Sequence, residues 1–173
     1  MRHIVGSIEG EYRRYRKLGS DAMAQLTALQ LAAQPSPESN SIATIVWHVS
    51  GNLTSRFTDF LTEDGEKPWR EREEFAARQV EPAELSAKWD RGWEVLMAAL
   101  DELTDMDLER TVRIRGVDLT VTEALHRSLA HTSSHVGQIT FLAKMLKGSE
   151  WTYLSIPPGG TAAYNANPTL EKS

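Results

Sequence analysis

The chain contains no cysteine among its 173 residues. Disulfide bonds, thiolate metal sites and a cysteine nucleophile are therefore excluded, and a cytoplasmic location fits this composition. Long hydrophobic runs are also missing. None approaches the ~20 residues of a membrane span, and the N-terminus has no long apolar signal core. We therefore expect a soluble protein without a membrane partner.

An excess of basic charge is lacking as well. The chain carries 19 lysine and arginine residues against 24 aspartate and glutamate residues, and its formal net charge is −5 at pH 7. A dedicated nucleic-acid-binding domain depends on a basic surface, so no nucleic-acid partner is expected. Acidic residues accompany the local basic positions, which are interpreted as solvated surface: Arg13, Arg14, Arg16, Arg70 and Arg72.

Apolar residues recur at spacings of three and four along most of the sequence, which is typical of amphipathic helices. The length suits a single domain over residues 1–173. The fold class predicted from this pattern is all-α, a four-helix bundle with helices at about residues 3–33, 41–61, 82–104 and 121–147. Gly19 lies in the first apolar stripe, where it would permit a close approach of another helix. Trp89 and Trp93 are expected in the core.

Local signals fix several helix ends and connections. Thr120 and Glu123 form the sequence signature of a capping box at the start of the last helix, and Gly148 is a natural stop. The polar stretch Thr62–Arg78 predicts a long surface crossover. Residues 111–120 alternate around Gly116 and predict a small β-hairpin before the last helix.

The tail at residues 149–173 is predicted to be non-helical. Its apolar residues, among them Trp151 and Leu154, are too many for a free segment, so we expect it to pack on the bundle. From Ala162 onward it is expected to become flexible.

The histidines carry the strongest chemical signal. His131 and His135 are one helical turn apart and lie on nearly the same face. If their helix packs against the one that carries His48, three imidazoles make a metal site with open coordination positions. The alternative is a metal-free bundle whose histidines bond to hydroxyl or carbonyl groups. Thr132 stands where a His-Glu-x-x-His protease carries its general base, so that chemistry is disfavoured.

Other polar residues are weaker candidates for such a site. Asn52, one turn after His48, is either a partner that orients a ligand or a polar flank, and the second interpretation is preferred. His126 should point away from His131, and His3 is near the terminus. No catalytic residue is identified. The candidates for a general base are Asp90 and Glu94 on the third helix and Tyr153 in the tail.

Several longer motifs accompany the histidine pattern. They are Ile45–Leu53, Arg56–Leu61, Asp64–Trp69 and, in the tail, Leu154–Pro157. With a histidine early in the second helix and His-x-x-x-His in the fourth, the chain resembles an uncharacterised subfamily of the DinB superfamily, metal-binding four-helix bundles. The resemblance covers nearly the whole chain.

The resemblance implies that His48, His131 and His135 bind a divalent ion, zinc or nickel. Known activities in that superfamily include thiol S-transferases that use bacillithiol or mycothiol, and a thiol-dependent maleylpyruvate isomerase. It thus implies a small-molecule substrate, with thiols as the leading class, and a homodimer. The leading hypothesis is a metal-dependent transferase that uses a low-molecular-weight thiol. The alternative is a non-catalytic dimeric binding or stress-response protein with a structural or adventitious metal.

Overall fold

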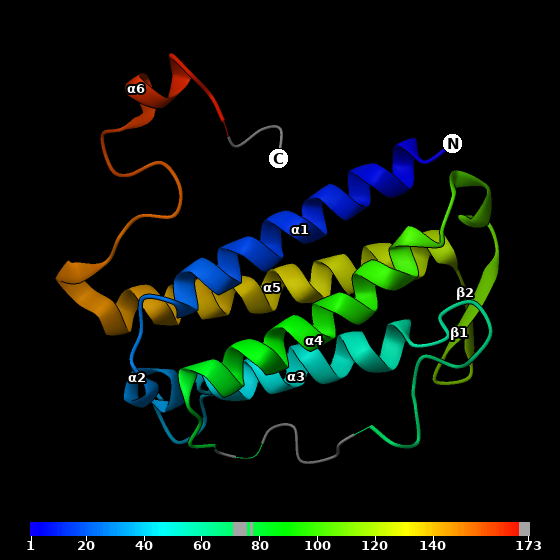
Figure 1. Cartoon of the computed structure of the whole chain (residues 1–173), viewed down its shortest axis with the longest axis horizontal. Helices are drawn as coiled ribbons and strands as arrows, with labels where there is room; N and C mark the ends of the chain where they lie inside the picture. The colour runs from blue at the N-terminus through cyan, green and yellow to red at the C-terminus, as the bar shows by residue number, and fades with distance from the viewer. Residues whose placement is uncertain (71–75, 77, 170–173) are drawn as a thin grey trace.

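Four long helices lie alongside one another in the computed structural model, which describes residues 1–70, 76 and 78–169 (Figure 1). They are α1 (His3–Met23), α3 (Ile42–Phe57), α4 (Pro82–Asp101) and α5 (Val121–Lys147). The shorter elements are α2 (Ala28–Ala32), α6 (Thr161–Asn165), the 3₁₀ turns η1 (Asp105–Asp107) and η2 (Gly148–Glu150), and a two-stranded sheet of β1 (Thr111–Ile114) and β2 (Val117–Thr120). In the described part of the chain, no helix is both long and apolar enough to cross a membrane.

The prediction of one continuous helix over residues 3–33 is wrong, because α1 ends at Met23 and a separate α2 begins after Thr27. Thr27 and Gln30 form a capping box, in which each side chain bonds the other residue's backbone N–H. Such local side-chain bonds compete with continuation of a helix and mark a new N-terminus. The turn also returns Leu26 and Leu31 to the core, where both are buried.

The second and third predicted helices end earlier than expected. The predicted range 41–61 becomes α3, which stops at Phe57, and Asp59 then adopts a positive φ of 50°. The hydroxyl of Thr58 bonds the carbonyl of Thr54 at this end. The range 82–104 becomes α4, which stops at Asp101. The last helix, α5, has the bounds that its capping box and Gly148 predict.

Close helix contacts on α4 define the tightest part of the core. A Cβ atom added at Gly92 would lie 2.7 Å from the Cα of Ser50, so α3 and α4 approach each other closely there. A Cβ atom added at Gly19 would lie 2.7 Å from the ring of Trp89. The predicted role of Gly19 as a site of close approach is therefore confirmed. Trp89 and Trp93 are buried as predicted, with ring centroids 5.2 Å apart.

The hairpin is held beside the end of α3 by the chain that follows that helix. Strands β1 and β2 pair antiparallel, and Arg115 and Gly116 form the turn with positive φ angles of 54° and 75°. The carboxylate of Asp64 accepts hydrogen bonds from the backbone N–H groups of Arg115 and Gly116.

Part of the predicted surface connection Thr62–Arg78 is therefore packed, and Lys67 is only 4% exposed. The aliphatic stem of a lysine can be buried while its ammonium group is paired, here with Glu63 at 2.8 Å. Residues 71–75 and 77 of this connection lie outside the described residues.

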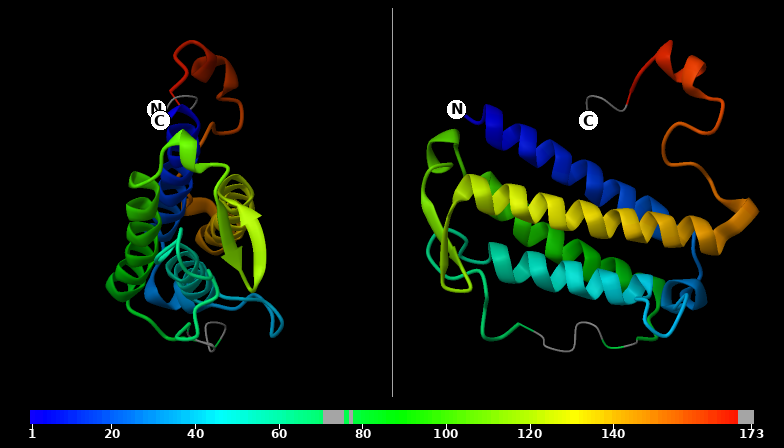
Figure 2. Two further views of the ribbon diagram at one scale, coloured as in Figure 1. Left: turned by 90° about the vertical axis from the view of Figure 1, so that its right-hand side faces the viewer. Right: turned by 180° about the vertical axis from the view of Figure 1, so that it is seen from behind.

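The C-terminal segment follows its prediction only in its first residues. Trp151 and Leu154 pack against the core, and Thr152 exchanges two hydrogen bonds with Gln25. Beyond them the chain runs away from the long helices, and α6 lies apart from them (Figures 1 and 2). The prediction of a non-helical tail is wrong at α6, and residues 170–173 lie outside the described part.

Candidate metal centre

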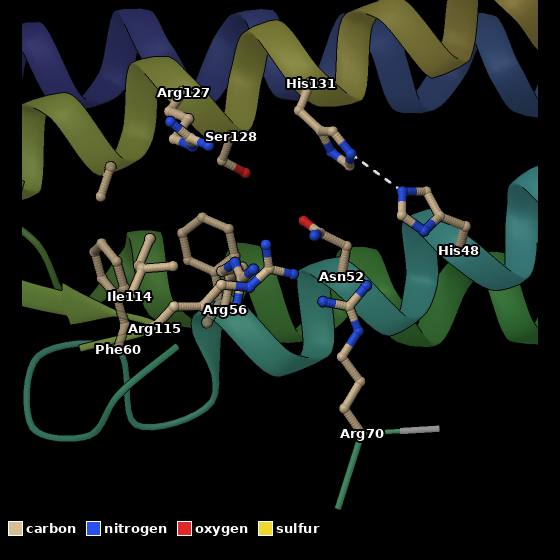
Figure 3. A pocket seen from close by; sticks show the side chains of 12 residues that line it. His48, Asn52, Arg56, Phe60, Arg70, Ile114, Arg115, Arg127, Ser128 and His131 are labelled. Carbon is tan, nitrogen blue, oxygen red and sulfur yellow. Dashed lines mark hydrogen bonds between the residues drawn. The ribbon is translucent and has the colours of Figure 1, made fainter. Parts of the chain in front are cut away.

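The structure brings His48, His131 and His135 together at the interface of α3 and α5. The Nε2 atom of His131 lies 3.1 Å from the Nε2 of His48 and 3.2 Å from the Nε2 of His135. One ligand nitrogen from each ring lies within 4.8 Å of the others. Figure 3 shows His131 and His48 pointing toward each other from the two helices. The condition that the sequence left open, that these two helices pack together at the histidines, is met in the structure.

The histidines lie at the edge of the buried face of α5, and each is half-buried. Gln138 and Met145 follow the histidines at helical spacings along α5, but both are exposed. The positions buried beside the histidines are Thr132 and Val136. The buried face of α5 therefore passes beside the imidazoles, which are open to more than the core.

Gln138 orients His135, a contact that was not predicted from the sequence. The Nδ1 of His135 lies 2.9 Å from Oε1 of Gln138, one turn along α5. An amide oxygen only accepts, so Nδ1 carries the hydrogen and Nε2 presents its lone pair to the cluster. A hydrogen bond of this kind fixes the ring of most metal-binding histidines. The signal was available, since residues at i and i+3 on a helix are neighbours.

Hydrogen bonds alone satisfy this cluster poorly. Because Nε2 of His135 carries a lone pair, a hydrogen bond between His131 and His135 needs His131 to donate the single hydrogen on its Nε2. The same hydrogen cannot also bond His48 well at 3.1 Å. Ligand nitrogens of a tetrahedral zinc ion, with bonds of about 2.0–2.1 Å, lie roughly 3.3 Å apart. The donor set and its two short spacings therefore fit a shared cation.

The protonation state of His131 suits the same purpose. Burial, together with the nearby His135, His48, Arg70 and Arg56, lowers the pKa of His131 from 6.5 to about 4. The imidazole is therefore neutral at neutral pH, and no proton must be displaced from it before it can act as a ligand.

A cavity of about 320 Å³ opens beside His48 and His131. Its apolar wall comes from the end of α3 and the turn after it, the hairpin and α5. It consists of Phe57, Phe60, Ile114 and Ala124. Asn52 and Ser128 also line the cavity, and Figure 3 shows both side chains directed toward it. The candidate ligands are therefore next to a space that a small molecule can enter.

Four arginines line the same cavity: Arg56, Arg70, Arg115 and Arg127. The prediction that Arg70 is a solvated surface residue is wrong, since its side chain is only 9% exposed. The side chains of Arg56, Arg70 and Arg115 surround one carboxylate oxygen of Glu66, at 2.9, 3.6 and 3.0 Å. Burial acts to raise the pKa of Glu66, but the hydrogen bonds and charges of Arg56 and Arg115 lower it overall.

A sequence signal for the arginines was present. His48, Asn52 and Arg56 follow at intervals of four on α3, so they share one face. Arg127 and His131 have the same spacing on α5. Because α3 is otherwise apolar over most of its length, a polar stripe of this kind marks a functional face rather than a solvated one.

Comparison with known proteins places the chain in a family. Residues 2–160 match the profile of a family described as proteins of unknown function, DUF1572. The chain belongs to the DUF1572 family. No curated protein sequence matches it.

A solved structure resembles the DUF1572 chain in fold. It is described as the crystal structure of the conserved protein of locus from Enterococcus faecalis. The TM-score is 0.66 at 18% sequence identity, over 86% of this chain and 99% of that one. A similarity at this identity concerns the fold alone, so function must be argued from the site.

The other residues considered from the DUF1572 sequence lie away from the centre. Asp90 accepts a hydrogen bond from Arg16, Glu94 is exposed on α4, and Tyr153 is exposed beside Lys144. None of these three candidate bases lines the cavity. The two remaining histidines, His126 and His3, are exposed, and neither joins the cluster.

Proposed function

We propose that this DUF1572 protein binds a divalent metal ion through the Nε2 atoms of His48, His131 and His135. The observation that carries the proposal is the convergence of three imidazole nitrogens beside an open cavity. Among the described residues, this group of candidate ligands has three members. Structural zinc sites almost always use four protein ligands, whereas catalytic sites use three and leave a position for water or substrate. The three-ligand set favours the second kind.

We also infer the class of reaction, a metal-dependent transfer that uses a low-molecular-weight thiol. The resemblance to DinB bundles, with one histidine on α3 and two on α5, supports this inference. A bound zinc or nickel ion, both of which suit imidazole ligands, would lower the pKa of a thiol and hold it as an anion. The chain has no cysteine, so the thiol must come from a small molecule. His135, fixed by Gln138, and the apolar wall of the cavity would orient that molecule.

Metal content tests the first part of the proposal. The protein is purified without an affinity tag or added metal, and elemental mass spectrometry compares it with a His131→Ala/His135→Ala variant. We expect about one zinc or nickel ion per chain, and its loss in the variant. His126→Ala is the matched control, since it removes an exposed histidine from the same helix. Absence of stoichiometric metal, with no uptake during titration at neutral pH, overturns the proposal.

Substitution with cobalt(II) tests whether a coordination position is open. If a thiol can reach the ion, adding cysteine or 2-mercaptoethanol to the cobalt protein should produce a thiolate-to-metal charge-transfer absorption. An unchanged spectrum would mean a closed shell and favour the non-catalytic alternative. A positive result would direct a screen of thiol-transfer reactions.

A further inference from the structure

The end of the cavity opposite the histidines is built from arginine side chains that the proposed metal site does not use. We propose that this end binds the carboxylate or phosphate group of a small organic substrate, whose other end faces His48 and His131. The proposal deepens the proposed function and rests on it for the role of the histidine end. The arginine end stands on its own contacts.

The charges around the cavity favour an anion. Among the residues that the structure describes, its lining includes four guanidinium groups and no carboxylate. Two carboxylates lie beside this group, and only the first bonds its guanidinium groups. One is Glu66, shared among three of the arginines, and the other is Asp64, whose oxygens accept backbone N–H groups of Glu66, Arg115 and Gly116. Neither carboxylate bonds Arg127, so its positive charge remains for a ligand to neutralise.

Donor atoms are available at the same place. Arg56 uses Nη1 for the carbonyl of Gly65 and for Glu66, and no described residue accepts from its Nε or Nη2. Arg115 uses Nε for Glu66. Arg127 makes no hydrogen bond or ion pair with any residue that the structure describes. Guanidinium groups with unused N–H pairs match the paired oxygens of a carboxylate or phosphate.

The size of the cavity limits the ligand to a small molecule. Its volume of about 320 Å³ is at the lower end of the ~300–1,000 Å³ typical of small-molecule sites. The apolar wall formed by Phe57, Phe60 and Ile114 suits a short hydrocarbon segment between two polar ends. A folded polymer or a nucleic-acid strand would not fit such a space.

The helical spacing gives the length that such a molecule must span. Arg127 precedes His131 by four residues on α5, a rise of about 6 Å, and Arg56 follows His48 by eight residues on α3, about 12 Å. Figure 3 shows these side chains at opposite ends of one space. An anionic group bound by the arginines therefore places atoms a few bonds away within reach of the histidines.

An NMR titration of the full isotope-labelled chain, followed through the arginine Nε–H signals, tests the proposal. The probes are succinate, inorganic phosphate and succinamide, which is the neutral counterpart of succinate. Succinate or phosphate should shift the signals of Arg56 and Arg115 and saturate, whereas succinamide should not. The tighter of the two anions identifies the carboxylate or the phosphate as the natural head group.

Variants show whether the arginine end is responsible. Arg127→Ala should weaken the preferred anion about 10-fold, the loss expected for one charged hydrogen-bond donor. Arg14→Ala is the matched control, since it removes an exposed arginine on α1 and should leave the affinity unchanged. Equal affinity in the Arg127→Ala variant and the wild type, or no saturable binding of either anion, overturns the inference.

The same proteins separate this inference from the proposed function. Normal metal content with no anion binding would leave the metal site intact and refute the arginine site. Anion binding by a wild-type chain that takes up no metal would support the arginine site and refute the metal centre.

Discussion

Helix α3 has two faces that differ in the surroundings of their polar groups. On one face they are bonded within the packed core, and on the other they border a cavity. Toward α4, Ser50 bonds the carbonyl of Lys88 at 2.7 Å, and its Cα leaves no room for a side chain at Gly92. Toward α5, Asn52 makes no hydrogen bond with any described residue, and His48 and Arg56 border a cavity. The first face stabilises the fold through filled volume. The second keeps polar atoms available, which costs stability and is typical of functional sites.

The largest effect on stability should come from removing a buried side chain on the packed side of the molecule, where α3 and α4 meet. Trp93 is 0% exposed on α4 and meets Trp89 and Tyr12 edge-on. Trp93→Ala should therefore lower the free energy of unfolding by about 3–5 kcal/mol, because it removes a large buried side chain and leaves a cavity. Urea denaturation followed by circular dichroism measures the change.

The control for this substitution is Trp69→Ala, in which the lost side chain is 56% exposed. Its free energy of unfolding should change by no more than about 0.5 kcal/mol. Similar losses for the two tryptophans would contradict the assignment of the packed side.

A smaller effect should come from adding one methyl group at the contact between α3 and α4. Gly92→Ala places a Cβ atom 2.7 Å from the Cα of Ser50, so a helix must shift. Overpacking of this kind should reduce stability by about 1–3 kcal/mol, even though alanine favours helices. Thermal and urea unfolding both measure this loss.

Gly137→Ala on α5 is the matched change, since a Cβ atom there meets nothing within 4 Å. It should raise stability by about 0.5–1 kcal/mol, the ordinary preference of a helix for alanine over glycine. If Gly92→Ala and Gly137→Ala change the free energy of unfolding in the same direction, the close contact at Gly92 is not the cause of the effect there.

The packed side was easier to predict from the sequence than the cavity side. Apolar periodicity and the capping box at Thr120 and Glu123 are local signals, so they indicated α5 and the burial of Trp89 and Trp93. The break before Thr27 was missed because a capping box inside an apolar stripe competes with helix continuation, and periodicity alone does not say which prevails. The position of the C-terminal segment depends on distant contacts, and only Trp151 and Leu154 followed the expectation.

For the candidate site, the spacing of His131 and His135 and the position of His48 predicted a group that the structure brings together. Arg70 was misjudged because a charged residue in a polar stretch of sequence is most often solvated, and this arginine reaches the cavity only through the folding of a connection. Glu66 and Arg115 are far apart in sequence, so their contact could not be predicted from local pattern. The stripe of His48, Asn52 and Arg56 could have been.

The smallest effect expected here concerns acid pH on the cavity side. Glu66 has a pKa below its ordinary value of 4.5, and it is surrounded by Arg56, Arg70 and Arg115, with Asp64 nearby. Its ionised form is thus favoured in the folded state. Its contribution to stability is complete above pH 4.5 and is lost as the pH falls through the lower, folded-state pKa.

Melting temperatures of the wild type and Glu66→Gln, measured at intervals from neutral to acid pH, test this. The wild type should be the more stable at neutral pH, and the two curves should converge in acid as Glu66 itself becomes uncharged. Glu109→Gln, at an exposed position without an ion pair among the described residues, should follow the wild type throughout. If the difference in melting temperature between the wild type and Glu66→Gln stays constant with pH, Glu66 acts through packing. That result would contradict an electrostatic role for Glu66 on the cavity side of α3.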